Sequence, residues 1–194
     1  MHQWLTTLIY KPVWAIKVAA NVLTFLFRSR RSLCKPRVFN FFRALRTEPL
    51  PETKDLKIGI AGFCWGGQYA VLLTHDTPSS RVQRANDDSG QIKPLIDCAH
   101  TAHPSFLSVP KDIEAVSLPL SVAVGDKDMV LSKDKAYAVK EILEKKKAGD
   151  HEVVIYQGAK HGFAVRGDPD DPSQFELGEN SRSQALAWFS SRLQ

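Results

Sequence analysis

The chain has 194 residues, of which 43% are hydrophobic and 24% charged. This composition suits one domain with a sizeable core and excludes a disordered or low-complexity chain. The net charge of +5 arises in residues 1–47, which hold nine Lys or Arg and no Asp or Glu, while the remainder holds 17 basic and 21 acidic residues. A nucleic-acid surface requires basic residues spread over a recognition face, so we expect no nucleic-acid partner.

The three cysteines, Cys34, Cys64 and Cys98, are an odd number and fit no disulfide framework. They show no CxxC or CxxH spacing, so we expect no structural zinc, no other metal and no cofactor. Unpaired cysteines are typical of a reducing compartment, and we therefore expect a cytoplasmic location.

The N-terminal segment is apolar and basic. Trp4 to Phe27 is mostly apolar, but Lys11 and Lys17 interrupt it and leave a longest uncharged run of ten residues, about half the length of a spanning helix. We expect residues 1–50 to form one or two helices that pack on the domain, without a membrane partner. An organelle transit peptide and a helix lying on a membrane surface are the alternatives.

From residue 56 onward, apolar runs alternate with helical patterns. The patterns predict strands over 56–61, 95–99, 118–124 and 152–156, helices over 68–74, 132–147 and 177–193, and a polar loop over 76–89. Ser132 is the expected cap of the second helix, and Leu186, Phe189 and Leu193 form an apolar stripe on the third. Strands alternating with helices predict an α/β fold, a mainly parallel sheet flanked by helices, over residues 51–194. Pro49-Leu50-Pro51 marks its N-terminal boundary.

A tight turn around a cysteine follows the first predicted strand. Gly62-Phe63-Cys64-Trp65-Gly66-Gly67 has the spacing of a nucleophile elbow, in which glycines permit a sharp strand-to-helix turn that exposes the nucleophile. The helix N-terminus favours the thiolate of Cys64, and the backbone N–H of Trp65 is a candidate oxyanion donor. The alternative is a buried structural cysteine beside a turn.

An acid and a histidine follow two later strands. Gly125-Asp126-Lys127-Asp128 offers two carboxylates that can orient an imidazole, and strand direction alone does not choose between them. Gly158-Ala159-Lys160-His161-Gly162-Phe163 places His161 on a loop past the last strand. An acid that caps a turn and an ordinary loop histidine are the alternatives. The order Cys, Asp, His, with each residue after a strand, favours a nucleophilic hydrolase.

These three motifs resemble those of the dienelactone hydrolase family of α/β-hydrolases, above all its fungal members. The segment Thr101-Ala102-His103-Pro104-Ser105 is similar to the same subgroup, and the likeness runs from about Pro36 to the C-terminus. The resemblance implies that enol lactones or esters are cleaved by attack on the carbonyl. A lactone or ester of a fungal secondary metabolite, such as a polyketide, is the implied substrate class.

The resemblance also implies roles for individual residues. Cys64 and His161 match the family's nucleophile and base, and the G-x-x-D pattern places the acid on Asp128, with Asp126 second. Family members carry an arginine shortly after the histidine that contacts a substrate carboxylate. Here position 165 is valine, and Arg166 follows it. We expect His103 and Phe163 to line the substrate cavity with Trp65, and Arg166 to hold an acidic group.

The family has early strands ahead of the nucleophile, and a loop after one of them supplies a second oxyanion amide and a glutamate that contacts the cysteine. Only 63 residues precede Cys64, and their pattern indicates helices. We therefore expect an N-terminally incomplete fold with strand 56–61 at the sheet edge, and self-association through that apolar edge. The alternatives to an active enzyme are a weak or inactive homologue that binds a metabolite or partner, and a membrane-associated protein whose N-terminus is the working part.

Overall fold

The computed structural model describes residues 7, 10–85, 90–147, 150–166 and 171–194. Parts of two predicted segments, residues 4–6 and 8–9 of the first helix and 86–89 of the polar loop, lie outside the described residues. The chain forms two compact units, Met1–Asn40 and Phe41–Gln194. Their boundary lies inside a helix, ahead of the Pro49-Leu50-Pro51 segment.

In the part of the chain that the structure describes, two long helices precede the sheet. Helix α2 covers Lys11–Arg28 and α3 covers Arg31–Thr47, with Pro36 inside α3. Neither has an acidic residue in its first turn. None of the helices in the described part of the chain is long and apolar enough to span a membrane.

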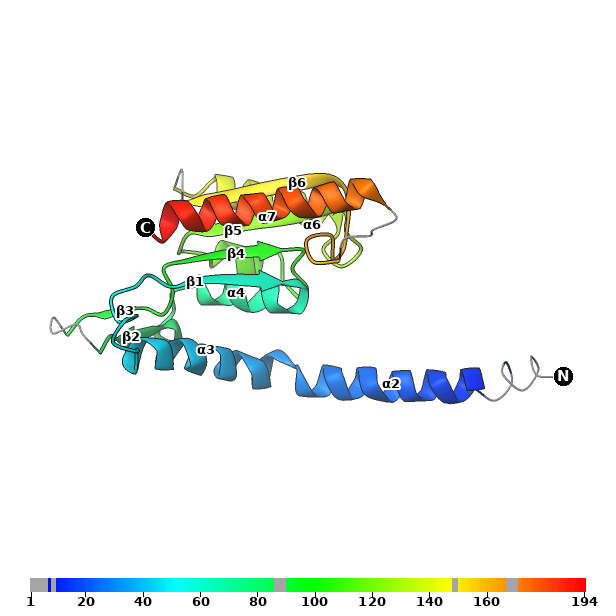
Figure 1. Cartoon of the computed structure of the whole chain (residues 1–194), viewed down its shortest axis with the longest axis horizontal. Coiled ribbons are helices and arrows are strands. Elements are labelled where there is room, and N and C mark those ends of the chain that lie inside the picture. Colours follow the sequence, from blue (N-terminus) through cyan, green and yellow to red (C-terminus); the bar gives the residue numbers. More distant parts are fainter. Residues whose placement is uncertain (1–6, 8–9, 86–89, 148–149, 167–170) are drawn as a thin grey trace. The chain divides into compact units, whose positions relative to one another are not determined.

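A parallel sheet of four strands forms the centre of the larger unit (Figure 1). Its order is β1 (Gly59–Phe63), β4 (Cys98–Ala102), β5 (Leu120–Lys127) and β6 (His151–Lys160), and every neighbouring pair is parallel. Parallel sheets are covered on both faces, so their inner strands are buried on both sides. All of β4, and all of β5 except Lys127, is buried accordingly. This arrangement confirms the predicted α/β fold.

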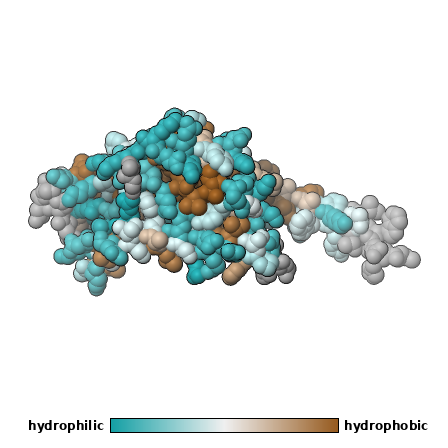
Figure 2. Space-filling view, turned by 90° about the horizontal axis from the view of Figure 1, so that it is seen from above, coloured by the Kyte–Doolittle hydropathy of each residue, from teal (hydrophilic) through white to brown (hydrophobic). Residues whose placement is uncertain are grey.

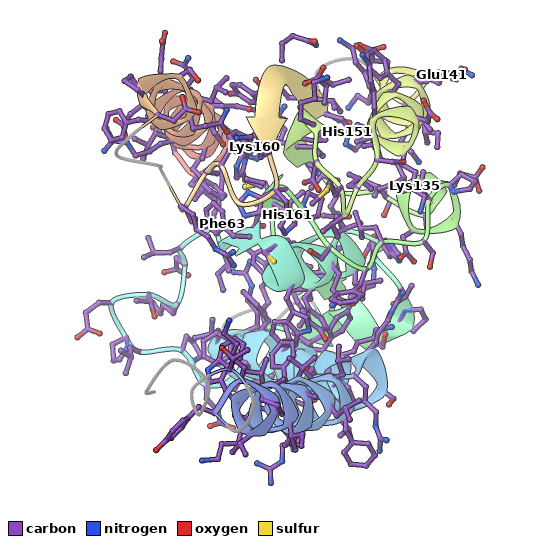
Figure 3. The ribbon with its side chains drawn as sticks, turned by 90° about the vertical axis from the view of Figure 1, so that its right-hand side faces the viewer. Phe63, Lys135, Glu141, His151, Lys160 and His161 are labelled. Atoms are coloured by element: carbon purple, nitrogen blue, oxygen red, sulfur yellow. The ribbon has the colours of Figure 1, made fainter. Side chains whose placement is uncertain are left out.

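Helices cover the two faces of the sheet. α4 (Gly67–Leu73), the short α5 (Lys111–Glu114) and α6 (Lys133–Glu144) connect successive strands, and α7 (Pro172–Arg192) follows β6. Right-handed crossovers between strands added in one direction place their helices on one face. Figure 3, which looks along the strands, shows α6 and α7 on opposite sides of β6.

Several boundaries differ from those that the apolar patterns indicate. Strand β1 begins at Gly59 and continues to Phe63. β4 begins only at Cys98, and the apolar Leu95 and Ile96 are buried in the segment that leads to it. Within and after the predicted polar loop, β2 (Arg81–Gln83) pairs antiparallel with β3 (Ile92–Pro94). These strands are three residues long, too short to give a period-2 pattern.

The two long helices also differ from the predictions in detail. α7 begins at Pro172 because the side chain of Asp171 accepts hydrogen bonds from the backbone N–H groups of Ser173 and Gln174. Ser132 stands at the N-cap of α6, as predicted, but its side chain makes no capping hydrogen bond. On the predicted stripe of α7, Phe189 contacts β1 at Gly59, whereas Leu186 is 60% exposed.

The start of β1 is held by a buried arginine. Arg46, in the last turn of α3, donates to the carbonyl oxygens of Leu95 and Leu56 and pairs with the Asp97 carboxylate. The same carboxylate accepts from the backbone N–H of Ile58, at 2.7 Å. Burial lowers the pKa of Arg46 and the Asp97 charge opposes this shift. The ion pair and its hydrogen bonds hold the residues just ahead of β1 and β4 in place.

The two edges of the sheet differ in character. β6 is one edge. Figure 2 views the molecule from the side where β6 lies and shows a hydrophobic patch among hydrophilic residues there. That strand carries His151, Glu152 and Lys160, and its register with β5 shifts near Gly125. β1 is the other edge; it contains no charged residue, and in the described residues no strand pairs with its outer side.

An apolar groove continues from the β1 edge. It has a volume of about 500 Å³ and runs between β1 and α7. Its walls include Ala61, Phe63, Phe163, Phe175, Leu186 and Phe189. Leu186 is exposed because it faces this groove instead of a packed neighbour. A free strand edge beside an apolar groove is a surface that favours pairing with another chain.

We expect the purified chain to self-associate through β1, because an uncharged edge strand offers unpaired N–H and C=O groups. Light scattering should report a mass above that of the monomer, and Ala61→Lys should lower it by placing a charge on the edge. Met129→Lys adds the same charge at a residue that is 94% exposed and outside β1, and it should leave the mass unchanged. A monomer at all concentrations, or equal effects of the two substitutions, would contradict this expectation.

Candidate active site

Cys64 lies at the turn between β1 and α4. It begins the short 3-10 helix η2 (Cys64–Gly66), and its φ of 50° is in the left-handed region that non-glycine residues rarely adopt. A Cβ on Gly62 would lie 2.7 Å from the Gly66 carbonyl oxygen, and one on Gly67 would lie 2.5 Å from Thr101 Oγ1. Gly62 and Gly67 are therefore required by close contacts across the turn, whereas a Cβ on Gly66 would meet nothing within 4 Å.

Cys64, His161 and Asp128 form a hydrogen-bonded chain. His161 follows β6 and lies close to the start of α4 (Figure 3). Its Nε2 is 3.2 Å from Cys64 Sγ, and its Nδ1 is 2.9 Å from Asp128 Oδ2. Asp128 also accepts from the backbone N–H groups of Val130 and Leu131, at 2.7 and 3.1 Å. These contacts fix the carboxylate and orient the imidazole toward the sulfur.

The other candidate acid has different partners. Asp126 is still within β5, where its Oδ1 accepts from the backbone N–H of Gly158 at 2.6 Å and its Oδ2 lies 3.8 Å from Lys133 Nζ. The structure thus brings Asp128 to His161, whereas Asp126 joins β5 to β6. The sequence alone does not choose between the two acids. They are two residues apart, and only the exact end of the strand decides which of them lies beyond it.

The electrostatics favour a charged pair at Cys64 and His161. Burial opposes ionisation of the Cys64 thiol, but its hydrogen bonds to Ser105, His161 and the backbone of Trp65 outweigh burial and lower the pKa of the thiol. For His161, burial favours the neutral ring, but hydrogen bonds to Cys64 and Asp128 raise the pKa of the imidazole. A lowered thiol pKa and a raised imidazole pKa widen the pH range in which a thiolate faces an imidazolium.

The remaining cysteine of the sheet has the opposite environment. Cys98 is 1% exposed in β4, and burial, followed by the charge of Asp97, raises the pKa of its thiol to about 11. Its thiol is therefore neutral at physiological pH and a poor nucleophile. The environments of Cys64 and Cys98 differ in the direction that distinguishes a reactive cysteine from a structural one.

The residues predicted to contact substrate lie in different places. Phe163 lines the apolar groove, whereas Trp65 packs edge-on against Tyr69, with its backbone N–H directed at Cys64. Arg166 is exposed, and its side chain passes close to Gly162. Of these positions, the Trp65 amide contacts Cys64, whereas Cys64 and His161 are not among the residues that line the groove.

His103 is enclosed behind the pair. It is fully buried, its ring centroid is 5.2 Å from that of His161, and it also contacts Phe63 and Phe163. Neither of its ring nitrogens has a hydrogen-bond partner in the described residues. Burial, aided by the neighbouring His161, lowers the pKa of His103 to about 4, so its ring is neutral at physiological pH.

Ser105 is the site residue that sequence reasoning did not assign. It lies on the loop after β4, and its hydroxyl oxygen is 3.5 Å from Cys64 Sγ. The sequence feature that points to it is its position. Ser105 lies two residues after His103, past the carboxyl end of a strand, in the segment 101–105 that resembles the family. In the described residues, no cluster of three or more His, Cys, Asp or Glu side chains is arranged to hold a metal ion.

Comparison with known proteins identifies relatives of this chain. The model of the dienelactone hydrolase family matches residues 17–192. The hydrolase tropI of Talaromyces stipitatus is 29% identical over 133 residues, which cover 69% of this chain and 45% of that protein. A probable 2-oxo-3-(5-oxofuran-2-ylidene)propanoate lactonase of a Bradyrhizobium species is 32% identical over 108 residues, covering 55% of this chain and 40% of that protein.

A solved structure gives the same fold. The dienelactone hydrolase of Anabaena variabilis superimposes with a TM-score of 0.58 at 18% identity, and the match covers 91% of this chain and 67% of that one. The chain spans about half the length, or less, of the two curated relatives named above. Because the family model matches most of its residues, the chain belongs to the dienelactone hydrolase family.

Proposed function

We propose that the chain cleaves a lactone or ester, with Cys64 as nucleophile, His161 as general base and acid, and Asp128 as the group that orients His161. The observation that carries the proposal is the hydrogen-bonded chain from Cys64 Sγ through the imidazole to Asp128, with distances of 3.2 and 2.9 Å. A nucleophile next to a base that a third group orients is the arrangement of covalent catalysis.

The geometry implies the following steps. The thiolate of Cys64 attacks the carbonyl carbon, and the negative charge moves to the carbonyl oxygen, where the backbone N–H of Trp65 can donate to it. The C–O bond of the lactone or ester breaks, and the departing alkoxide takes the proton from His161 Nε2. Water then loses a proton to His161 and attacks the thioester, which releases the acid and restores the thiol. From a lactone, the acid and the hydroxyl stay in one product, a hydroxy acid, which for an enol lactone is the enol form of a keto acid.

The residues next to the pair in the chain support a substrate class. Phe63 directly precedes Cys64, Phe163 lies two residues after His161, and both line the apolar groove, which suits a hydrophobic acyl group. Arg166 is the cation placed just after His161, and we propose that it binds an acidic group of the substrate. The named substrate of the Bradyrhizobium relative is a lactone with a carboxylate. The resemblance to fungal hydrolases supports a secondary metabolite as the source of the ester.

A second candidate function is binding without efficient turnover. The Trp65 amide is the backbone donor that the structure records at Cys64, and loss of one of two oxyanion donors costs about 10²–10³ in kcat. The free outer side of β1 in the described residues favours this alternative. A weak or inactive homologue would bind a metabolite or a partner through the same groove.

Trapping the acyl-enzyme tests the proposal directly. Incubation with an activated aryl ester, followed by acid quench and peptide mass spectrometry, should show the acyl group on the peptide that contains Cys64. The peptide that contains Cys98 should stay unmodified and is the internal control, because that thiol is buried and neutral. Product release without any acyl group on Cys64, or acylation of Cys98 instead, would be incompatible with the proposed mechanism.

A further inference from the structure

Ser105 contacts both members of the Cys64–His161 pair. Its hydroxyl oxygen is 3.5 Å from Cys64 Sγ and 3.5 Å from His161 Nε2, and the residue is only 3% exposed. Its backbone N–H donates to the carbonyl oxygen of Cys64 at 2.9 Å. The loop after β4 is therefore tied to the nucleophile by one main-chain contact and one side-chain contact.

The backbone of this loop adopts an unfavourable path on both sides of Ser105. His103 has a φ of 40° and Phe106 a φ of 59°, both in the left-handed region. The loop is held there by the backbone N–H of His103, which donates to Ala123 at 2.8 Å, and by Pro104, which packs closely against Gly67. Strained backbone persists where the surroundings determine it, and here it directs a hydroxyl at the sulfur.

We propose that Ser105 is a positioning residue whose hydroxyl donates a hydrogen bond to the Cys64 thiolate, which stabilises the charged Cys64–His161 pair and holds the sulfur in place. The consequence for catalysis rests on the proposed function, but the hydrogen bond can be measured without turnover. No bond to hydrogen breaks at Ser105. When the thiolate attacks a carbonyl, the negative charge leaves the sulfur and this hydrogen bond weakens.

The charges around the pair support a separate contribution from the hydroxyl. His161, which Asp128 orients, is the ionisable partner of Cys64. Burial keeps the ring of His103 neutral, and the charge of Arg166 also lowers the pKa of that ring. Burial raises the pKa of the Cys64 thiol. Among the contacts that lower this pKa, the hydrogen bond with Ser105 has the largest effect, followed by those with His161 and the Trp65 amide. Hydrogen bonds to charged groups are stronger than those to neutral ones.

The pH dependence of alkylation measures this contribution. The rate at which iodoacetamide labels Cys64, followed by peptide mass spectrometry, should rise with the thiolate fraction and reach an alkaline plateau. In Ser105→Ala, the rate on the acidic limb should fall about tenfold while the plateau is unchanged, so the midpoint moves to higher pH. Ser105→Thr keeps the hydroxyl and should retain the wild-type midpoint. Ser108→Ala, on the same loop but exposed, is the matched control.

A serine that served only the fold would change the yield of folded protein but not this midpoint. If Ser105→Ala loses the circular dichroism spectrum of the native chain, Ser105→Gly takes its place in the same comparison. An unchanged midpoint in a folded variant would overturn the inference. A shifted midpoint in a chain that hydrolyses no ester would uphold the hydrogen bond and count against the proposed function, so the two can fail separately.

Discussion

Replacing Cys64 by alanine should lower kcat for an activated ester by about 10⁴-fold or more. The sulfur is the atom that forms the thioester, and no other group restores that covalent step once it is gone. The measurement is release of the aryl alcohol under saturating substrate, corrected for the amount of folded protein.

Cys98→Ala is the matched control for this substitution. It removes a thiol of the same kind from β4, where the side chain is buried and its pKa is raised to about 11. Activity per folded molecule should stay within about twofold of wild type, although some stability is lost because a small cavity is left. Retention of more than a tenth of the activity by Cys64→Ala would exclude Cys64 as the nucleophile.

Much of the fold could be predicted from the sequence because the strands of a parallel sheet are buried on both faces and therefore appear as apolar runs. The strand ends were less predictable. β1 begins three residues later than its apolar run because the Asp97 carboxylate takes the backbone N–H of Ile58. β2 and β3 were missed because three-residue strands give no period. The start of α7 depends on a capping contact of Asp171 with Ser173 and Gln174, which periodicity does not show.

The candidate site, like the fold, has one part that the sequence predicts and another that it does not. The elbow glycines, Cys64 and His161 were predictable because the chemistry restricts which residues stand at those positions. Ser105 was not, because its role depends on the positive φ angles of His103 and Phe106 on either side of it. The enclosure of His103 by the rings of Phe63, His161 and Phe163 was equally hard to predict, since it joins the end of β1, the loop after β4 and the segment after β6.

The choice of acid gives the second large expected effect. Asp128→Asn should lower kcat by about 10³–10⁴-fold, because an amide at this position supports the wrong tautomer of His161 and does not stabilise its charged form. Asp126→Asn is the matched control, since it makes the same chemical change two residues away, at a carboxylate whose partners are Gly158 and Lys133. It should leave kcat nearly unchanged and act, if at all, on stability.

The pH dependence separates a catalytic role of Asp128 from a structural one. The Asp128 carboxylate helps to raise the pKa of His161 above its usual value, so the imidazolium, and the charged pair with Cys64, survive to higher pH. In Asp128→Asn this support is lost, and the alkaline limb of the activity profile should move to lower pH. The alkylation profile of Cys64 should move the other way, because a neutral imidazole stabilises the thiolate less. Equal losses of activity in the two variants, or unchanged profiles in Asp128→Asn, would reject Asp128 as the residue that orients His161.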